Sequence, residues 1–80
     1  MNNTNSINIK KRIDDIWSNI LEKNQIDIRD DFFELGGNSL QAIRLLHEVS
    51  ETFHVDLDME DFLENPTVNH LVKTIMHLKH

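Results

Sequence analysis

The chain has 80 residues, of which 28% are charged and 39% hydrophobic, which is typical of one small domain with a modest core. It has no cysteine, which excludes disulfides, thiolate metal ligands and cysteine nucleophiles and suits a reducing, cytoplasmic setting. A net charge of −6 argues against nucleic acid as a partner, because phosphate binding requires cations, and no apolar run is long enough to indicate a membrane partner.

The first third of the chain predicts a tail, a helix and a long loop. Residues 1–7 are polar and Asn-rich, so we expect a disordered tail, followed by the folded domain over 8–80. Apolar side chains then recur on one helical face, which predicts a helix over about 8–23: Ile9, Ile13, Ile16, Trp17, Ile20 and Leu21. Residues 24–38 lose this period but remain rich in large apolar side chains. We therefore expect an ordered loop, anchored to the core by at least one of Phe32 and Phe33.

A second helix is predicted from about Ser39 to Phe53. Asn38 is a good N-cap for it, and the adjacent Gly36 and Gly37 allow a positive φ and a close backbone approach just before it. The apolar stripe that faces the core consists of Ala42, Leu45, Leu46, Val49 and Phe53.

Two more helices complete the prediction. Asp58 caps a short helix from Met59 to about Asn65, with Asp61 at the capping-box position, and Pro66 ends it. Thr67 caps a last helix, whose stripe is Val68, Leu71, Val72, Ile75, Met76 and Leu78 or Lys79. No segment alternates over the length of a strand, so the fold class is all-α, a small bundle of three longer helices and one short helix.

The catalytic and metal motifs that this sequence partly matches are all incomplete. Gly37 to Gln41 begins like the nucleophile elbow G-x-S-x-G but ends in Gln, and no strand precedes it. The Gly pair is not followed by the Gly-Lys-Ser/Thr of a phosphate-binding loop. A calcium loop starting at Asp56 lacks its central Gly and its final Glu. With no cysteine and only scattered histidines, we expect no catalytic constellation and no metal site.

Ser39 is the remaining candidate. A serine near a helix start is ordinarily a cap, but Asn38 already fills that position. The start of a helix carries free N–H groups and a partial positive charge, which favour a phosphate. On a helical wheel Leu40 projects away from the apolar stripe and Ile43 lies on its flank, which predicts a docking surface beside Ser39. The alternative is that these two residues contact the long loop or the short helix.

The run from Asp31 to Leu40, Asp-Phe-Phe-Glu-Leu-Gly-Gly-Asn-Ser-Leu, resembles the attachment motif of phosphopantetheine-bearing carrier proteins. It is most similar to the peptidyl carrier (thiolation) domains of nonribosomal peptide synthetases. The resemblance continues through the following helix to Asp61–Val68, and by pattern it includes the first helix. It implies a four-helix carrier bundle.

The resemblance also implies the chemistry. Ser39 would receive a 4′-phosphopantetheine arm from coenzyme A by the action of a phosphopantetheinyl transferase, supported by Gly36, Gly37 and Asn38. The two glycines, which lack a Cβ, would let the transferase reach the hydroxyl. The arm would hold aminoacyl, peptidyl or acyl groups as thioesters, and the carrier itself would catalyse nothing.

The implied partners are the transferase and the adenylation, condensation or ketosynthase, and thioesterase domains, which would dock on Leu40 and Ile43. We expect a monomer. Asn38 stands where peptidyl carriers most often have His or Asp. The helix after Ser39 is less acidic than in fatty-acid carriers, which favours the peptidyl or polyketide subtype. The alternatives are an acyl carrier of a polyketide pathway, or an unmodified helical interaction module.

Overall fold

The computed structural model describes residues 6–79, and within that range all regular structure is helical. The four helices are α1 (Ser6–Leu21), α2 (Ser39–Phe53), α3 (Met59–Glu64) and α4 (Val68–Leu78). The predicted class, an all-α bundle of three longer helices and one short helix, is confirmed.

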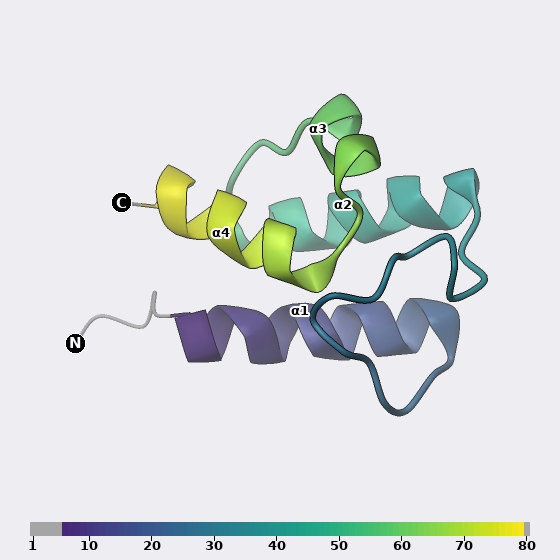
Figure 1. Cartoon of the computed structure of the whole chain (residues 1–80). Helices are drawn as coiled ribbons and strands as arrows, with labels where there is room; N and C mark the ends of the chain where they lie inside the picture. The colour runs from purple at the N-terminus through teal and green to yellow at the C-terminus, as the bar shows by residue number, and fades with distance from the viewer. Residues whose placement is uncertain (1–5, 80) are drawn as a thin grey trace.

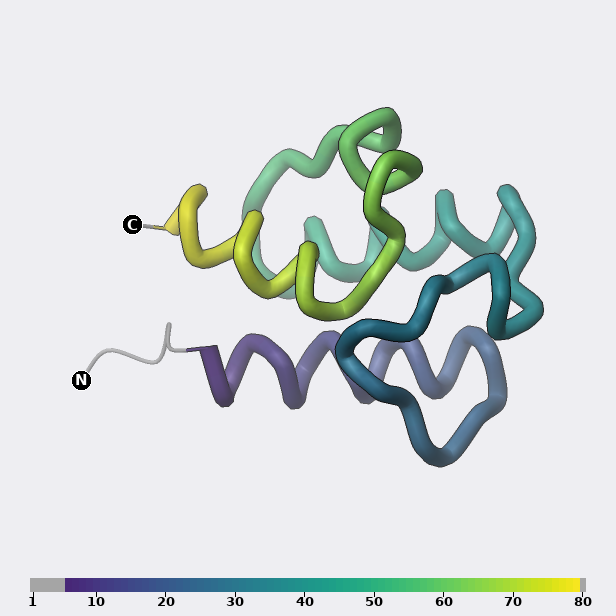
Figure 2. Tube along the Cα trace, in the orientation of Figure 1, coloured from purple at the N-terminus to yellow at the C-terminus, as the bar shows by residue number. Residues whose placement is uncertain are grey.

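The start of α2 lies far from the start of α1 and from the end of α4. α1 packs against both α4 and α2 and runs in the opposite direction to them (Figure 1). The long loop after α1 folds back across the end of the bundle at which α2 begins (Figure 2). Ser39 therefore lies at the end of the molecule opposite to the first turn of α1 and the last turn of α4.

The core is formed by the predicted stripes together with three aromatic rings. Trp17, Phe32 and Phe62 are almost completely buried and meet edge to face, with the Trp17 ring centroid 5.1 Å from that of Phe32 and 6.1 Å from that of Phe62. Phe32 is the loop anchor predicted from the sequence, and Phe33 packs against it. The long loop thus contributes a central ring to the core.

The predicted stripe of α4 is too long at its C-terminal end. Ile75 is fully buried, but Met76 and Leu78 are 37% and 47% exposed. Ile7 in the first turn of α1 is exposed as well, so the core does not extend to the first turn of α1 or the last turn of α4.

The predicted boundaries of α1 are wrong by two residues at each end. Ser6 and Ile7 are helical rather than part of a tail, and the rest of the predicted tail, residues 1–5, lies outside the described residues. The helix ends at Leu21 because Glu22 takes a left-handed φ of 56° and the Lys23 amide donates to the Ser18 carbonyl. α2 ends in the same way, with His54 at a φ of 58°.

The predicted caps of the last two helices are present, but the predicted capping box at α3 is wrong. Asp58 accepts a hydrogen bond from the Glu60 amide, and Thr67 accepts one from the His70 amide. Asp61 does not close a box, because its carboxylate instead lies 2.8 Å from His70 Nε2 on α4. α3 ends at Glu64, one residue before the predicted Asn65.

Candidate functional site

The candidate site lies at the start of α2, where Asn38 caps the helix as predicted. The Asn38 side chain accepts a hydrogen bond from the Gln41 amide at 2.8 Å. The Gln41 side chain in turn accepts one from the Asn38 amide at 3.0 Å, so the two residues form a reciprocal capping box. Ser39 is the first residue of the helix and lies between them, with its side chain exposed.

The two glycines before the site are required for different reasons. Gly36 has a φ of +105°, a conformation that side chains with a Cβ rarely adopt, and the space around it is open. A Cβ on Gly37 would lie 2.4 Å from Phe32 Cε2 and 2.8 Å from the Phe32 carbonyl oxygen. The close backbone approach predicted for the pair therefore occurs at Gly37, and it is to the core ring of Phe32. Access of a transferase past these glycines stays a prediction.

The loop that leads to Ser39 is held by backbone hydrogen bonds to the junction between α3 and α4. The Phe32 amide donates to the Pro66 carbonyl at 2.8 Å, and the Asn69 amide donates to the Ile28 carbonyl at 2.9 Å. The Asp31 carboxylate caps the turn that follows by accepting from the Phe33 and Glu34 amides. The residues before Ser39 are thus fixed to the body of the bundle despite their lack of regular structure.

The first turn of α2 has an unused capacity for hydrogen bonding. The Asn38 amide bonds to the Gln41 side chain, and the Gln41 amide bonds to the Asn38 side chain. Within residues 6–79, the amides of Ser39 and Leu40 have no acceptor. These two donors lie beside the Ser39 hydroxyl at the positive end of a helix, so a phosphate esterified to that hydroxyl fits there.

Leu40 and Ile43 are exposed, as the helical wheel predicts. Leu40 is 76% and Ile43 56% exposed, which rules out the alternative that they are covered by the loop or by α3. With Gln41, Arg44 and His47 they line a shallow hollow of about 420 Å³ next to Ser39. Its surface is mostly apolar, which suits docking of another protein, although such docking stays a prediction.

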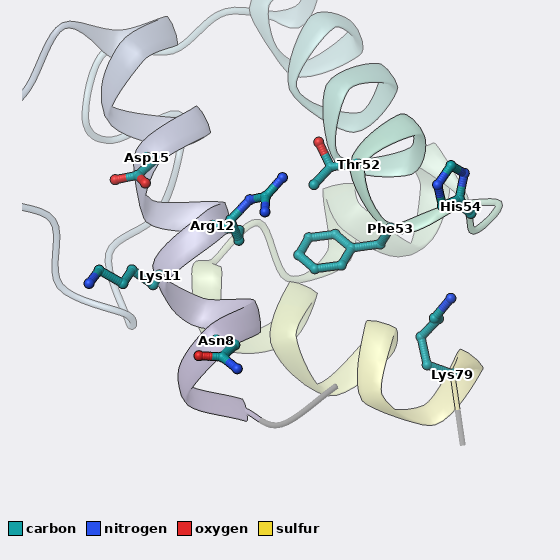
Figure 3. A pocket seen from close by; sticks show the side chains of 8 residues that line it. All are labelled: Asn8, Lys11, Arg12, Asp15, Thr52, Phe53, His54 and Lys79. Atoms are coloured by element: carbon teal, nitrogen blue, oxygen red, sulfur yellow. The ribbon is translucent and has the colours of Figure 1, made fainter. Parts of the chain in front are cut away.

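A larger hollow lies elsewhere. It has a volume of about 580 Å³ and lies between the N-terminal half of α1 and the C-terminal ends of α2 and α4 (Figure 3). Arg12 and Phe53 line it, and Phe53 is about 21 Å along α2 from Ser39 at 1.5 Å per residue. This hollow is too far from Ser39 to form part of the same site.

The described residues contain neither a cluster of metal ligands nor a helix able to span a membrane. Among residues 6–79 there is no group of three or more His, Asp or Glu side chains placed to hold a metal ion. Over the same residues, no helix has the length and apolar character needed to cross a bilayer.

Gln41 is the site residue that the sequence prediction missed. Its signal was present, because Asn38 and Gln41 have the spacing of a capping box, with the cap residue three positions before a Gln or Glu. The same spacing at Asp58 and Asp61 does not produce a box in the structure.

Comparison with known families identifies the family of the chain. The profile described as "Phosphopantetheine attachment site" matches residues 11–75, which includes the whole loop, Ser39 and the apolar hollow lined by Leu40 and Ile43. The chain belongs to this family of phosphopantetheine carrier domains. The resemblance noted for the run from Asp31 to Leu40 is thereby confirmed, as is covalent phosphopantetheine as the prosthetic group of the family.

The carrier domain is similar to segments of large peptide synthetases. It is 39% identical over 70 residues to Gramicidin S synthase 2 of Brevibacillus brevis and 38% identical over 65 residues to Tyrocidine synthase 3 of Brevibacillus parabrevis. These matches cover 88% and 81% of the chain but only 2% and 1% of the respective synthetases. The chain therefore corresponds to one small part of the relatives it matches.

Solved carrier structures share the fold. The peptidyl carrier protein solved with coenzyme A and the phosphopantetheine transferase Sfp superposes with a TM-score of 0.83 at 26% identity, covering 86% of this chain and 90% of that chain. BlmI, a type-II acyl-carrier-protein from Streptomyces verticillus involved in bleomycin biosynthesis, gives a TM-score of 0.86 at 27% identity, covering 94% and 90%. The carrier domain thus has the bundle of both peptidyl and acyl carriers.

Proposed function

We propose that Ser39 is the attachment residue and that the chain carries aminoacyl, peptidyl or acyl groups for a nonribosomal peptide or hybrid peptide/polyketide synthetase. The observation that supports this most is the position of Ser39 at the first turn of α2, exposed and beside two free backbone amides. When bound, the phosphopantetheine arm supplies a thiol that holds the carried group as a thioester. The chain itself has no cysteine to do so.

In this function the residues of the chain present a hydroxyl and receive a phosphate. The amides of Ser39 and Leu40 are placed to donate to the phosphodiester oxygens, and the helix dipole stabilises its negative charge. The Asn38 side chain is engaged by the Gln41 amide, so it holds the helix start rather than the phosphate.

We further propose that the domain is not an enzyme. Ser39 Oγ forms no hydrogen bond to an acid or a histidine within the described residues, and a serine hydroxyl is a weak nucleophile without such a base. A separate phosphopantetheinyl transferase would supply that activation. The solved complex of a similar peptidyl carrier protein with such a transferase supports this partner.

The other proposed partners act after loading. An adenylation domain would load the arm, which the similar McyG A-PCP structure supports at a TM-score of 0.78 and 33% identity. A condensation or ketosynthase domain and a thioesterase would then accept the carried group. Leu40 and Ile43 offer these enzymes a small apolar contact, which suits repeated and reversible docking. A monomeric, cytoplasmic carrier remains our prediction.

Loading with coenzyme A, Mg²⁺ and a broad-specificity transferase tests the proposal. We expect intact-mass spectrometry to show the gain of one phosphopantetheine group in the wild type and in the control variant Ser50→Ala, and no gain in Ser39→Ala. A wild type that gains nothing favours the alternative of an unmodified helical interaction module. A gain that persists in Ser39→Ala places the arm elsewhere. Turnover of model esters by the unmodified wild type, lost in Ser39→Ala, would indicate a hydrolase instead.

A further inference from the structure

The Gln41 side chain holds the residue that precedes Ser39. Its Oε1 accepts from the Asn38 amide at 3.0 Å, while its own amide donates to Asn38 Oδ1 at 2.8 Å. The two hydrogen bonds join residues 38 and 41 and enclose Ser39 within the linked segment. This pair therefore constrains the backbone conformation of Ser39.

The same side chain also joins α2 to α1. Gln41 Nε2 donates to the Ile20 carbonyl at 3.5 Å, and that carbonyl lies in the last turn of α1, where no later helical amide is available to it. Ile20 is itself buried in the core. Gln41 therefore connects the start of α2 to a fixed part of the bundle.

Little else fixes Ser39 directly. Its side chain is exposed, and within residues 6–79 neither its amide nor its hydroxyl has a hydrogen-bond partner. The residues before it are fixed to the bundle through backbone hydrogen bonds, and the Ala42 amide donates to the Asn38 carbonyl at 2.9 Å. Within residues 6–79, the capping box adds the side-chain hydrogen bonds that act on this turn, and the order of the turn depends in part on them.

We propose that Gln41 is a positioning residue for phosphopantetheinyl transfer, because it holds the first turn of α2 in the form that the transferase accepts. This inference rests on the proposed function. In the transfer, Ser39 Oγ forms a bond to the β-phosphorus of coenzyme A, and the pyrophosphate P–O bond breaks to release adenosine 3′,5′-bisphosphate. The hydroxyl proton passes to a base of the transferase. Gln41 touches none of these atoms.

The expected effect is on KM rather than on kcat. A capping interaction contributes about 1 kcal/mol, and 1.4 kcal/mol corresponds to a tenfold ratio, so loss of the box lowers the ratio of the ordered to the frayed first turn about fivefold. When the competent form is a minor fraction, apparent affinity falls by that fraction. At saturating carrier the bound turn is ordered by the transferase, so kcat changes little.

Three variants of the full chain test this. Gln41→Met keeps side-chain length and helix propensity but removes both side-chain hydrogen bonds. Gln41→Glu restores the acceptor for the Asn38 amide, since Glu is the usual partner in a capping box. Asp58→Ala is the matched control, because it removes a cap from α3, where Asp58 accepts from the Glu60 amide at 3.0 Å. Loading kinetics with coenzyme A and a transferase are measured together with hydrogen exchange of the Asn38 amide.

We expect Gln41→Met to raise the KM for loading by up to about fivefold and to speed exchange of the Asn38 amide, while Asp58→Ala loads like the wild type. Gln41→Glu, which keeps the capping box but not the bond to Ile20, should be impaired less than Gln41→Met. A wild-type KM in Gln41→Met overturns the proposal, as does equal impairment in Asp58→Ala, which would indicate a general loss of stability. Impairment of Gln41→Glu equal to that of Gln41→Met also overturns it. If the wild type itself is not loaded, the proposed function fails instead, and this inference with it.

Discussion

The contact between Gly37 and Phe32 predicts that adding one methyl group at position 37 lowers the free energy of unfolding substantially. A Cβ at position 37 would lie 2.4 Å from Phe32 Cε2, 2.6 Å from Phe32 Cδ2 and 2.8 Å from the Phe32 carbonyl oxygen. The ring has no free space to move into, because Phe32 is fully buried and meets Trp17 and Phe62 edge to face. Gly37→Ala must therefore displace both a core ring and a segment of backbone.

The size of the effect follows from the cost of overpacking. Inserting a methyl group into a filled core typically costs about 1–3 kcal/mol. A domain of this length has a free energy of unfolding of about 4–12 kcal/mol, so the substitution removes a substantial part of it. At about 4–8 °C per kcal/mol, we expect Tm to fall by at least about 4 °C.

The chain provides its own probe and a matched control. Trp17 is the only tryptophan and is fully buried, so its fluorescence reports urea unfolding. Gly36→Ala adds a methyl group next door in open space, and its cost comes from the positive φ alone. In a Phe32→Leu background the cost of Gly37→Ala should shrink, because the ring atom Cε2 is gone, whereas the cost of Gly36→Ala should not change.

Two results would refute this reasoning. One is a loss of less than about 0.5 kcal/mol in Gly37→Ala, the range of an ordinary surface substitution. The other is an unchanged cost in the Phe32→Leu background, which would show that the ring is not the obstacle.

Three further substitutions have expected outcomes. Glu22→Gly should raise the free energy of unfolding by up to about 1 kcal/mol in urea titration, because Glu22 has a left-handed φ that glycine adopts freely. A lower free energy of unfolding would show that the backbone of Glu22 is not strained. Ile43→Asp should leave far-UV CD and Tm near the wild type, because Ile43 is 56% exposed, yet weaken loading by the transferase; a collapsed fold would show that Ile43 supports the core. His70→Gln should lower Tm by only a few degrees and speed amide exchange in α3, because the partly exposed contact between His70 and Asp61 joins α3 to α4. Unchanged amide exchange would show that this contact does not hold α3 in place.

The helices and their caps could be predicted because their signals are local. Apolar side chains at helical spacing indicate which face of a helix is buried. Helix starts are indicated by capping residues, whose side chains accept hydrogen bonds from the first turn: Asn38, Asp58 and Thr67. The end of α1 could not be predicted in the same way, because the usual stop signal is glycine and the left-handed position is occupied by Glu22.

Apart from its Phe32 anchor, the path of the long loop had no sequence signal. Its anchors to the α3–α4 junction are hydrogen bonds between backbone groups, from the Phe32 amide to Pro66 and from the Asn69 amide to Ile28. Any residue other than proline supplies the same donor, so side-chain identity does not encode the pairing. For the same reason the sequence predicted a close approach at the glycine pair but not that Phe32 is what Gly37 approaches.

The helix ends place Ser39 far from both ends of the bundle's polypeptide path. The first turn of α1 and the last turn of α4 lie at one end of the molecule, and Ser39 begins α2 at the other (Figure 1). Along α2 alone this separation is about 21 Å. A rotation of the rigid bundle by one radian about its terminal end therefore swings the Ser39 hydroxyl through about 21 Å, a distance comparable to the length of α2 itself. If Ser39 bears the arm as proposed, reorientation of the whole domain would displace the point of attachment by this distance with no change inside the bundle.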